Sequence, residues 1–344
     1  MSQVLPQSFR ATIVPHPGDF DVIQMNEIPF PEQCAGELVI KVHYAGVNFM
    51  DNHVRSGGYP VSAYPYRFGV EGSGVVVGLP SDPDTLGDED FIKRAFKIGS
   101  KVAFIGPGAF SEYVTISWKR AHVLPEGVSL RTGAAIHAQG LTALSFVEEA
   151  FPVKHGDIIL VHTVAGGVGL LLAQLIKMKG GIVIGTTSTP EKAEIAKKNG
   201  ADHVILYKSE DVVKRVLEIT EGEGVHAIFD GVGLDTFELD FKVIRRKGTI
   251  LFLGETSGPL PPIQSSKLVE KNIYVARPTV ANYAFTPKDG YQYTKRLYNL
   301  VLERKLEVLI HAEYPFTVEG VRNSGKDLQN GNSIGKLLVK VEAD

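Results

Sequence analysis

The sequence has few of the residues that form disulfides and metal sites. Its 344 residues include a single cysteine, Cys34, so the chain cannot form an internal disulfide. One cysteine also excludes a four-cysteine structural zinc site. With no recognisable base nearby in the sequence, Cys34 is more typical of a bystander than of a nucleophile.

Long apolar runs and an excess of one charge are also missing. No apolar stretch approaches a membrane span, and the start, Met1 to Pro6, lacks the charged and apolar regions of a signal peptide. The 36 basic and 39 acidic residues are well mixed and give a net charge of −3, which offers no electrostatic footprint for nucleic acid or an anionic membrane. We therefore expect a soluble protein of the cytoplasm. A chain of this length is long for one core and natural for two domains.

The most informative segment is a glycine-rich turn between an aliphatic run and an apolar helix. Ile158–Val161 is typical of a central parallel strand, and Leu170–Lys177 predicts a largely buried helix. The turn Val164–Gly169 brings glycines to positions where the backbone can approach phosphate oxygens at the helix start. Val164 replaces the first glycine of a G-x-G-x-x-G fingerprint. This imperfect motif is weak evidence by itself, so the surrounding sequence must show whether the turn binds a dinucleotide.

That context is an alternation of strands and helices. Further strands are predicted at Gly180–Thr187, His203–Leu206, Ala227–Asp230, Thr249–Gly254 and Ile273–Ala276. Thr189 and Pro190 begin one intervening helix that ends at Asn199-Gly200, and Ser209 can cap another that runs through Thr220. The pattern predicts an α/β fold with a Rossmann-type, doubly wound parallel sheet and a ligand across the carboxyl ends of its strands. The alternative is an α/β domain that binds no dinucleotide.

The flanking regions have a different pattern. Short strands between turns are predicted at Leu38–Ala45, Val70–Val77, Lys101–Phe104, Tyr113–Ile116, Leu306–Ile310 and Lys336–Lys340, with a helix at Tyr291–Arg304. These regions indicate an irregular, mostly antiparallel, β-rich unit. We therefore expect a dinucleotide-binding domain at 137–281, inserted in a catalytic domain formed by 1–136 and 282–344. Pro80–Asp90 is interpreted as a solvated acidic loop.

A series of short motifs carries a resemblance over nearly the whole chain. They are Ala45–Asp51, Arg55–Pro60, Gly69–Gly74, Gln139–Ala143, Ala165–Gly169, Asp230–Gly233 and Ala276–Pro278. In this order and spacing, the chain resembles the medium-chain dehydrogenases/reductases, specifically the zinc-free quinone oxidoreductases related to zeta-crystallin, and most of all their fungal type. The resemblance implies a GroES-like catalytic domain, and a homodimer that joins sheets edge to edge through Ile273–Ala276.

The resemblance also implies which residues form the site. Zinc-dependent relatives carry a Gly-His-Glu segment where this chain has Gly69-Val70-Glu71, so we expect no metal. Asn48, His53 and Tyr59 correspond to residues that line the substrate slot. The residues implied for cofactor binding are Asn48, Thr142, Ala165, Gly166, Gly167, Val168, Gly185, Ser188, Lys192, Tyr207, Gly231, Val232, Leu253, Gly254 and Lys336.

Each of these residues also has an ordinary structural interpretation. Asn48 can form a turn, Tyr59 can be a packed rim aromatic, and His53 is more typical of a polar rim residue than of a proton donor. Thr142 can be a helix-start hydroxyl, and Lys192 a solvated helix residue. His53 and Gly231 replace a tyrosine and a serine that are common in the family.

The end of the second predicted strand indicates the cofactor. An NAD-specific site needs an acidic side chain there to bind the ribose hydroxyls, whereas this chain has Gly185-Thr186-Thr187-Ser188. Ser188 can donate to a 2′-phosphate, and Lys192 and Tyr207 match family positions that bind it. We therefore predict NADPH as the cofactor.

Without a metal, the acceptor must already be electron-poor. Quinones satisfy this condition, and NADPH-dependent reduction of quinones by hydride transfer is our preferred function. α,β-Unsaturated ketones, aldehydes and enoyl thioesters use the same kind of slot and form the alternative. A second alternative, implied only by relatives, is a crystallin-like or AU-rich RNA-binding role. Basic clusters such as Arg245-Arg246-Lys247 are short and more typical of a helix end than of an RNA site.

Overall fold

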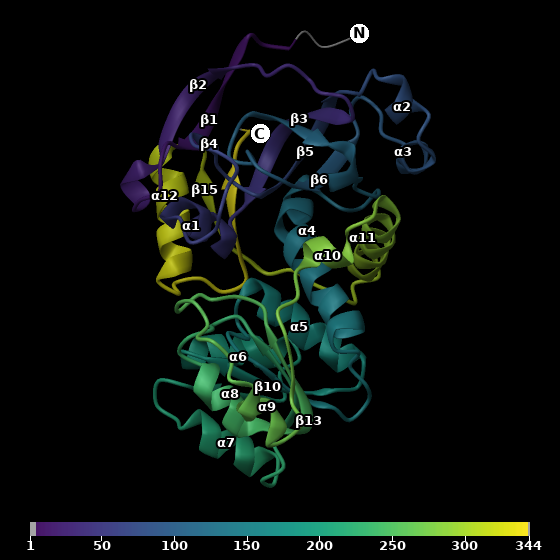
Figure 1. Cartoon of the computed structure of the whole chain (residues 1–344). Helices are drawn as coiled ribbons and strands as arrows, with labels where there is room; N and C mark the ends of the chain where they lie inside the picture. Colours follow the sequence, from purple (N-terminus) through teal and green to yellow (C-terminus); the bar gives the residue numbers. More distant parts are fainter. Residues whose placement is uncertain (1–4, 343–344) are drawn as a thin grey trace. The chain divides into compact units, whose positions relative to one another are not determined.

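The computed structural model describes residues 5–342 and divides into two compact units (Figure 1). Unit 1 comprises Met1–Ala138 and Ala284–Asp344, and unit 2 comprises Gln139–Tyr283. The prediction that Met1 to Pro6 is not a signal peptide concerns mainly residues 1–4, which lie outside the described residues. Among residues 5–342, no helix is both long enough and apolar enough to cross a membrane.

Unit 2 is built on a six-stranded parallel sheet. The strands lie in the order β11-β10-β9-β12-β13-β14. From β9 the chain proceeds to one edge of the sheet at β11, then crosses back to β12 and proceeds to the other edge at β14. The strands are β9 Ile158–Val161, β10 Ile182–Thr187, β11 His203–Leu206, β12 Val225–Asp230, β13 Ile244–Phe252 and β14 Tyr274–Ala276. This is the strand order of a Rossmann fold, so the predicted doubly wound sheet is confirmed.

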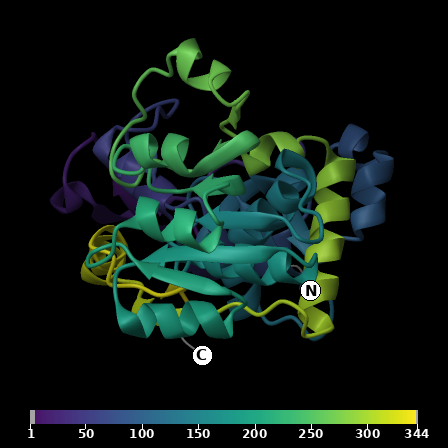
Figure 2. The same ribbon diagram turned by 90° about the horizontal axis from the view of Figure 1, so that it is seen from below.

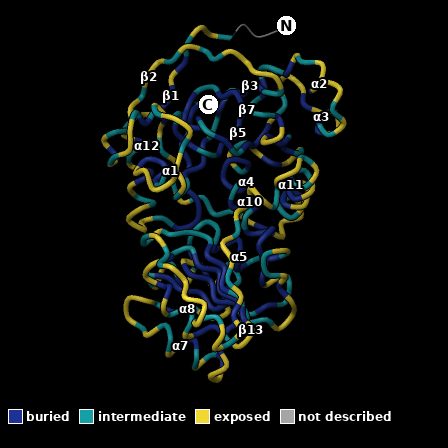
Figure 3. Tube along the Cα trace, in the orientation of Figure 1, coloured by how far each residue is buried: buried dark blue, intermediate teal, exposed yellow. Residues whose placement is uncertain are grey.

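Helices cover both faces of this sheet (Figure 2). They are α5 Gly167–Met178, α6 Pro190–Lys198, α7 Val212–Ile219, α8 Phe237–Val243 and α9 Ser265–Val269. The strands are buried between them (Figure 3), with Leu160, Ile184 and Ile228 fully enclosed. A continuous aliphatic strand is stable only when both of its faces are covered, which is why these runs form the centre of the sheet.

Unit 1 contains a seven-stranded sheet and a three-stranded sheet. The larger sheet runs β15-β16-β3-β5-β6-β8, with β7 also paired to β3, and all pairs except β15-β16 are antiparallel. Its strands are β3 Glu37–Gly46, β5 Glu71–Gly78, β6 Lys101–Ile105, β7 Tyr113–Ser117, β8 Ala121–Val123, β15 Ile310–Pro315 and β16 Lys336–Lys340. The smaller sheet contains β1 Ser8–Val14, β2 Gln24–Pro29 and β4 Tyr66–Arg67. The predicted irregular, mostly antiparallel unit is confirmed.

The helices of unit 1 lie around these sheets. They are α1 Phe49–Ser56, α2 Pro83–Leu86, α3 Glu89–Arg94, α11 Pro287–Leu302 and α12 Val318–Gln329. Helix α4, Leu130–Ser145, spans the boundary between the two units in the sequence and continues as a π-helical turn at Phe146–Ala150. The short helix α10, Val280–Tyr283, ends unit 2. Three 3₁₀ or π turns complete the chain, the other two being Phe20–Val22 and Trp118–Arg120.

The segment Pro80–Asp90 is mostly exposed, as predicted, but it is largely helical rather than a loop. It contains α2 and leads into α3, and the carboxylates of Asp82 and Asp88 cap these helices by accepting backbone N–H groups. The acidic residues thus serve as N-caps. At the end of α3, Arg94 is buried and donates to the carbonyl oxygens of Ala121 and Pro287. The segment therefore anchors the start of α11.

Two other predictions were wrong in detail, and one was confirmed. Helix α7 begins after Asp211 rather than Ser209, because the Asp211 carboxylate accepts the Lys214 N–H at 3.1 Å. Strand β15 starts at Ile310, because its pairing with β16 begins there, and the predicted strand Leu306–Ile310 mostly precedes it. The basic cluster Arg245–Lys247 lies at the start of β13, directly after the C-cap of α8, which fits its interpretation as a charge patch at a helix end.

Candidate functional site

Most of the predicted cofactor residues gather at the carboxyl ends of five strands of unit 2. The turn Val164–Gly169 follows β9, Gly185 and Ser188 lie at the end of β10, and Tyr207 follows β11. Gly231 and Val232 follow β12, whereas Leu253 and Gly254 follow β13. In a parallel sheet these ends form one edge, where doubly wound folds bind their ligands.

The turn after β9 is shaped to leave helix amides accessible. The Gly166 N–H donates to the carbonyl of Thr163 at 2.8 Å, and Thr163 has a φ of 52°, the left-handed conformation that reverses the chain. Gly166 is then the N-cap of α5 and has no side chain to occupy the first amides. A Cβ at Gly169 would lie 2.4 Å from the Thr163 oxygen, so only glycine permits this close packing. The result is an anion site of backbone amides at a helix start.

The structure accounts for the missing first glycine of the fingerprint. Val164 is fully buried, and its N–H donates to the carbonyl of Thr186 at 3.1 Å. A Cβ on Gly185 would lie 2.4 Å from a methyl group of Val164. The space that a glycine normally provides in the turn is therefore provided by a glycine on the neighbouring strand. Val164 and Gly185 form a matched pair.

From Gly185 to Pro190, the end of β10 and the residues after it carry hydroxyl groups and no carboxylate. Thr189 caps α6 by accepting the Lys192 N–H at 3.3 Å, which starts the helix just after Ser188. The Tyr207 N–H donates to the Thr187 carbonyl at 3.1 Å, so the segment after β11 lies beside the end of β10. Tyr207 is 50% exposed.

Lys192 is not the fully solvated residue of the ordinary interpretation. Partial burial lowers the pKa of Lys192, and the positive charge of Lys208 lowers it further. Two ammonium groups therefore act on each other at this edge, and an anion placed there would relieve their repulsion. Lys208 was not among the predicted site residues, although its position directly after Tyr207 was a usable signal.

The ends of β12 and β13 are tied together through Asp230. The Leu253 N–H donates to the Asp230 carbonyl at 2.6 Å, and the Asp230 carboxylate accepts the Val232 N–H, also at 2.6 Å. A Cβ on Gly254 would lie 3.0 Å from the Gly231 carbonyl oxygen. These contacts fix Gly231, Val232, Leu253 and Gly254 as one surface.

Thr142 lies in the last turn of α4, since the Ser145 hydroxyl donates to its carbonyl at 3.2 Å. Its ordinary interpretation as a helix-start hydroxyl is therefore wrong, because α4 begins at Leu130.

In unit 1, the predicted substrate residues come from one short segment. Asn48 is the N-cap of α1, His53 lies within α1, and Tyr59 follows in a turn in which its N–H donates to the His53 carbonyl at 3.1 Å. Phe49 and His53 are one helical turn apart, with ring centroids 6.3 Å apart. Tyr59 is 48% exposed, which fits a rim position better than a core position.

Asn48 is fixed by a buried ion pair. Its Nδ2 donates to the Gly46 carbonyl at 3.1 Å and to Glu71 Oε2 at 3.0 Å, and its Oδ1 accepts from Lys336 Nζ at 2.9 Å. Lys336 also binds Glu71 Oε2 at 2.6 Å, with the Lys336 side chain 3% exposed and that of Glu71 0% exposed. The Ala138 N–H donates to the other Glu71 oxygen at 2.6 Å.

This network gives Lys336 a different role from the predicted one. The resemblance implied that Lys336 binds the cofactor, but its ammonium is enclosed and already binds a carboxylate and an amide oxygen. Moving it to a phosphate would leave Glu71 buried without its counter-ion. We therefore assign Lys336 to the support of Asn48.

Asp51 is a second buried carboxyl group that sequence reasoning missed. Its Oδ2 accepts the Asn48 N–H at 2.7 Å. Burial raises the pKa of Asp51 to about 7, against the lowering effects of the Asn48 N–H and of Lys336. The capping pattern at Asn48 was visible in the sequence, whereas the burial of Asp51 depends on the fold.

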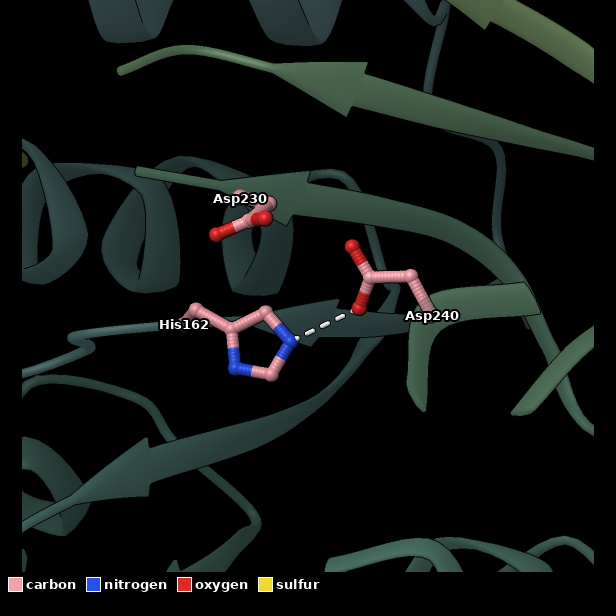
Figure 4. A group of neighbouring side chains, drawn as sticks. All are labelled: His162, Asp230 and Asp240. Carbon is pink, nitrogen blue, oxygen red and sulfur yellow. Dashed lines mark hydrogen bonds and ion pairs between the residues drawn. The ribbon is translucent and has the colours of Figure 1, made fainter. Parts of the chain in front are cut away.

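The residues present do not fit a catalytic zinc site. Cys34 is exposed, and Glu71 is bound to Lys336 with Val70, not histidine, before it. Within the described residues, only His162, Asp230 and Asp240 bring three possible ligand atoms together, and they are buried in unit 2 (Figure 4).

The sheet, its strand-end site and the GroES-like pattern of unit 1 define a dinucleotide-dependent oxidoreductase. Family models of the zinc-binding dehydrogenases and of the alcohol dehydrogenase GroES-like domain match residues 167–297 and 34–126. A probable quinone oxidoreductase of Schizosaccharomyces pombe is 34% identical over 328 residues, which is 95% of each chain. The chain therefore belongs to the quinone oxidoreductases of the medium-chain dehydrogenase/reductase family, and the predicted resemblance is confirmed.

Two further relatives bear on the cofactor and the substrate. The solved structure of Escherichia coli quinone oxidoreductase complexed with NADPH has a TM-score of 0.90 and 29% identity, covering 96% of this chain and 100% of that one. A 2-haloacrylate reductase of a Burkholderia species is 29% identical over 343 residues, 97% of this chain and 99% of its own length.

Proposed function

We propose that this protein transfers hydride from NADPH to quinones without a metal ion. The observation that carries the proposal is the edge formed by the ends of β9 and β10. It combines an anion-binding helix start at Gly166 with a strand end that lacks a carboxylate and lies beside Lys192 and Lys208. When bound, NADPH supplies the hydride. The E. coli relative is a quinone oxidoreductase solved with NADPH, which supports the same assignment.

We assign the parts of the cofactor to particular groups of unit 2. The amides at the start of α5, next to Ala165, Gly166, Gly167 and Val168, bind the pyrophosphate. Ser188, Lys192, Tyr207 and Lys208 bind the 2′-phosphate through hydroxyl and ammonium donors. Thr142 and the surface formed by Gly231, Val232, Leu253 and Gly254 position the nicotinamide half.

In unit 1, the segment from Asn48 to Tyr59 lines the slot for the acceptor. Asn48 positions the ring system through an amide that Glu71 and Lys336 fix in place. His53 and Tyr59 border the slot and set substrate preference. A hydroquinone anion delocalises its charge, so solvent can complete the protonation and no side chain of this segment has to act as an acid.

Metal independence follows from the side chains available. A Lewis acid would be needed to ionise a simple alcohol or to polarise an ordinary ketone. This chain has one cysteine, exposed, and valine where zinc-dependent relatives carry the histidine. An acceptor that is already electron-poor does not require such an ion.

One specific observation favours a second candidate function. The Burkholderia relative is named for the reduction of an acrylate, a carbon–carbon double bond conjugated to a carboxyl group. Reduction of such a bond requires protonation at carbon, for which His53 or Tyr59 would be the donor. The competing substrates are therefore enones and related conjugated acceptors.

Steady-state turnover on a matched panel tests the proposal. Purified enzyme is assayed with small quinones and with enones, using NADPH and NADH, before and after treatment with a chelator. We expect turnover of quinones with NADPH, and no loss on chelation. Rapid turnover of enones with no activity on any quinone would overturn the preferred substrate class.

We also propose a homodimer that joins two copies through β14, and a cytoplasmic location. Strand β14 pairs only with β13, so its other edge is unpaired within the described residues. Tyr274 is 67% exposed and Val269 73% exposed beside it, which is unusual for large apolar side chains. Light scattering should give twice the chain mass, and Val275→Pro should shift the mass toward one chain. Within residues 5–342, no feature favours an RNA-binding role over these assignments.

A further inference from the structure

Three buried side chains of unit 2 lie close together (Figure 4). His162 follows β9, Asp230 ends β12 and Asp240 lies in α8, and one atom from each lies within 4.8 Å of the others. His162 is 3% exposed, and both aspartates are 0% exposed. Nothing in the assigned function uses His162 or Asp240.

The hydrogen bonds of the group reach three strand ends of the cofactor edge. His162 Nδ1 bonds with the Thr186 hydroxyl of β10 at 2.9 Å, and its Nε2 bonds with Asp240 Oδ1 at 3.0 Å. Asp230 accepts the Val232 N–H at 2.6 Å and the Thr236 hydroxyl at 2.7 Å. The group therefore connects the turn after β9, the end of β10 and the turn after β12.

One carboxylate oxygen of the group accepts no hydrogen bond from a donor. This atom is the buried Asp240 Oδ2, whereas both ring nitrogens of His162 and both oxygens of Asp230 are bonded. A proton on Asp240 would be shared with the neighbouring Asp230 carboxylate. A divalent cation would need several free ligand atoms, and only this one is available. A proton needs one oxygen and turns it into a donor.

We propose that His162, Asp230 and Asp240 form one buried proton-binding unit that positions the cofactor turns and makes NADPH affinity depend on pH. This inference rests on the proposed assignment of those turns to NADPH. His162 and Asp240 are positioning residues, since they act through Thr186 and Asp230.

The charges within the unit determine how pH acts on it. Burial raises the pKa of Asp240 to about 7, an effect that His162 opposes and Asp230 reinforces. For His162, burial alone would lower the pKa, but Asp240 and Asp230 together raise it. The largest effects of charged groups on both pKa values come from within the unit, and β10 contributes the uncharged Thr186.

Loss of the shared proton adds a negative charge beneath the phosphate-binding edge. With an imidazolium and two carboxylates the unit carries a net charge of minus one, and with one further proton it is neutral. The anionic cofactor therefore binds the protonated unit more tightly. Affinity should fall as pH rises through neutrality.

The test compares the wild-type enzyme with Asp240→Asn, an isostere of the protonated form. The dissociation constant of NADPH is measured from its fluorescence between pH 5.5 and 8.5, and ionisation of the ligand cancels in the ratio of the two proteins. We expect equal affinity at the acidic end and about three- to tenfold weaker binding by the wild type at the basic end. Asp211→Asn, which removes an exposed carboxylate that caps α7, is the control and should follow the wild type. A ratio that is constant with pH would overturn the inference.

A second measurement needs no variant. In wild-type enzyme carrying ¹⁵N-histidine, the His162 ring signals should report the titration of Asp240, whose pKa burial raises to about 7, and NADPH should raise the midpoint by reciprocity. A midpoint unchanged by NADPH at saturation overturns the coupling. Failure of the wild type to bind NADPH at any pH would instead contradict the proposed function, while the titration of the free enzyme would still test the proton-binding unit. Stoichiometric uptake of Zn²⁺ or Mn²⁺ that is lost in Asp240→Asn would assign the group to a cation and overturn the proposal.

Discussion

Replacement of Glu71 by glutamine should strongly destabilise the protein. Glu71 accepts three hydrogen bonds in a site where its own side chain is 0% exposed and that of Lys336 is 3% exposed. Glutamine removes the charge but not the buried ammonium, and an uncompensated buried charge costs about 3–5 kcal/mol. At roughly 2–4 °C per kcal/mol for a domain of this size, the unfolding midpoint should fall by about 6–20 °C.

The assay is thermal and urea unfolding of a double-mutant cycle. Lys336→Met alone leaves the Glu71 carboxylate uncompensated, whereas Glu71→Gln with Lys336→Met removes both charges, so the double variant should lose less stability than the sum of the two single variants. Glu238→Gln is the control, because Glu238 is 68% exposed in its pair with Lys267 and should cost less than about 1 kcal/mol. Additive losses, or a midpoint for Glu71→Gln within about 2 °C of the wild type, would refute the reasoning.

Three further predictions follow from the site and the buried histidines. Lys192→Ala should weaken NADPH binding by roughly 1.5–3 kcal/mol and leave NADH binding unchanged, and Lys208→Ala should have a smaller effect of the same sign. If binding titrations show that Lys192→Ala weakens both cofactors equally, Lys192 does not contact the 2′-phosphate. His53→Ala should change KM and substrate preference more than turnover with quinones, whereas Asn48→Ala should lower kcat; for an enone, loss of His53 should reduce kcat by about 10²-fold if it is the proton donor. Burial lowers the pKa of His137 to about 4, so the unfolded chain binds more protons between that pH and the ordinary value near 6.5. The contribution of His137 to the free energy of unfolding should be complete above about pH 6.5 and fall by about 3 kcal/mol as the pH approaches 4. When the free energy of unfolding is measured with urea at several pH values, it should depend less steeply on pH in His137→Gln than in the wild type. An unchanged pH dependence would exclude this histidine as the cause.

The local features of unit 2 could be predicted from the sequence because they depend on neighbouring residues. Strands β9 and β11 begin and end at the predicted residues, and the turn from Val164 to Gly169 starts α5 as its glycines indicated. The sequence also allowed the class of sheet to be predicted, because strands that alternate with helices on short connections form parallel doubly wound sheets.

The features that sequence reasoning missed depend on distant residues. The ion pair of Lys336 and Glu71 joins positions 265 residues apart, and no local pattern reveals it. The burial of Arg94 at the end of α3 likewise depends on the packing of α3 against later elements, which turned a predicted acidic loop into a helical anchor. Lys208 is the exception, since its place directly after Tyr207 made it visible in the sequence.

The central claim is most directly tested by a single-turnover measurement. Enzyme of measured metal content is treated with chelator, loaded with NADPH and mixed in stopped flow with 1,4-benzoquinone or with a cyclic enone, while the loss of NADPH absorbance is followed. We expect the quinone to oxidise bound NADPH rapidly, at the same rate with and without chelator, and the enone to oxidise it more slowly. Bound NADPH that is inert to the quinone but rapidly oxidised by the enone, or a reaction lost together with about one zinc ion per chain, would contradict the central claim.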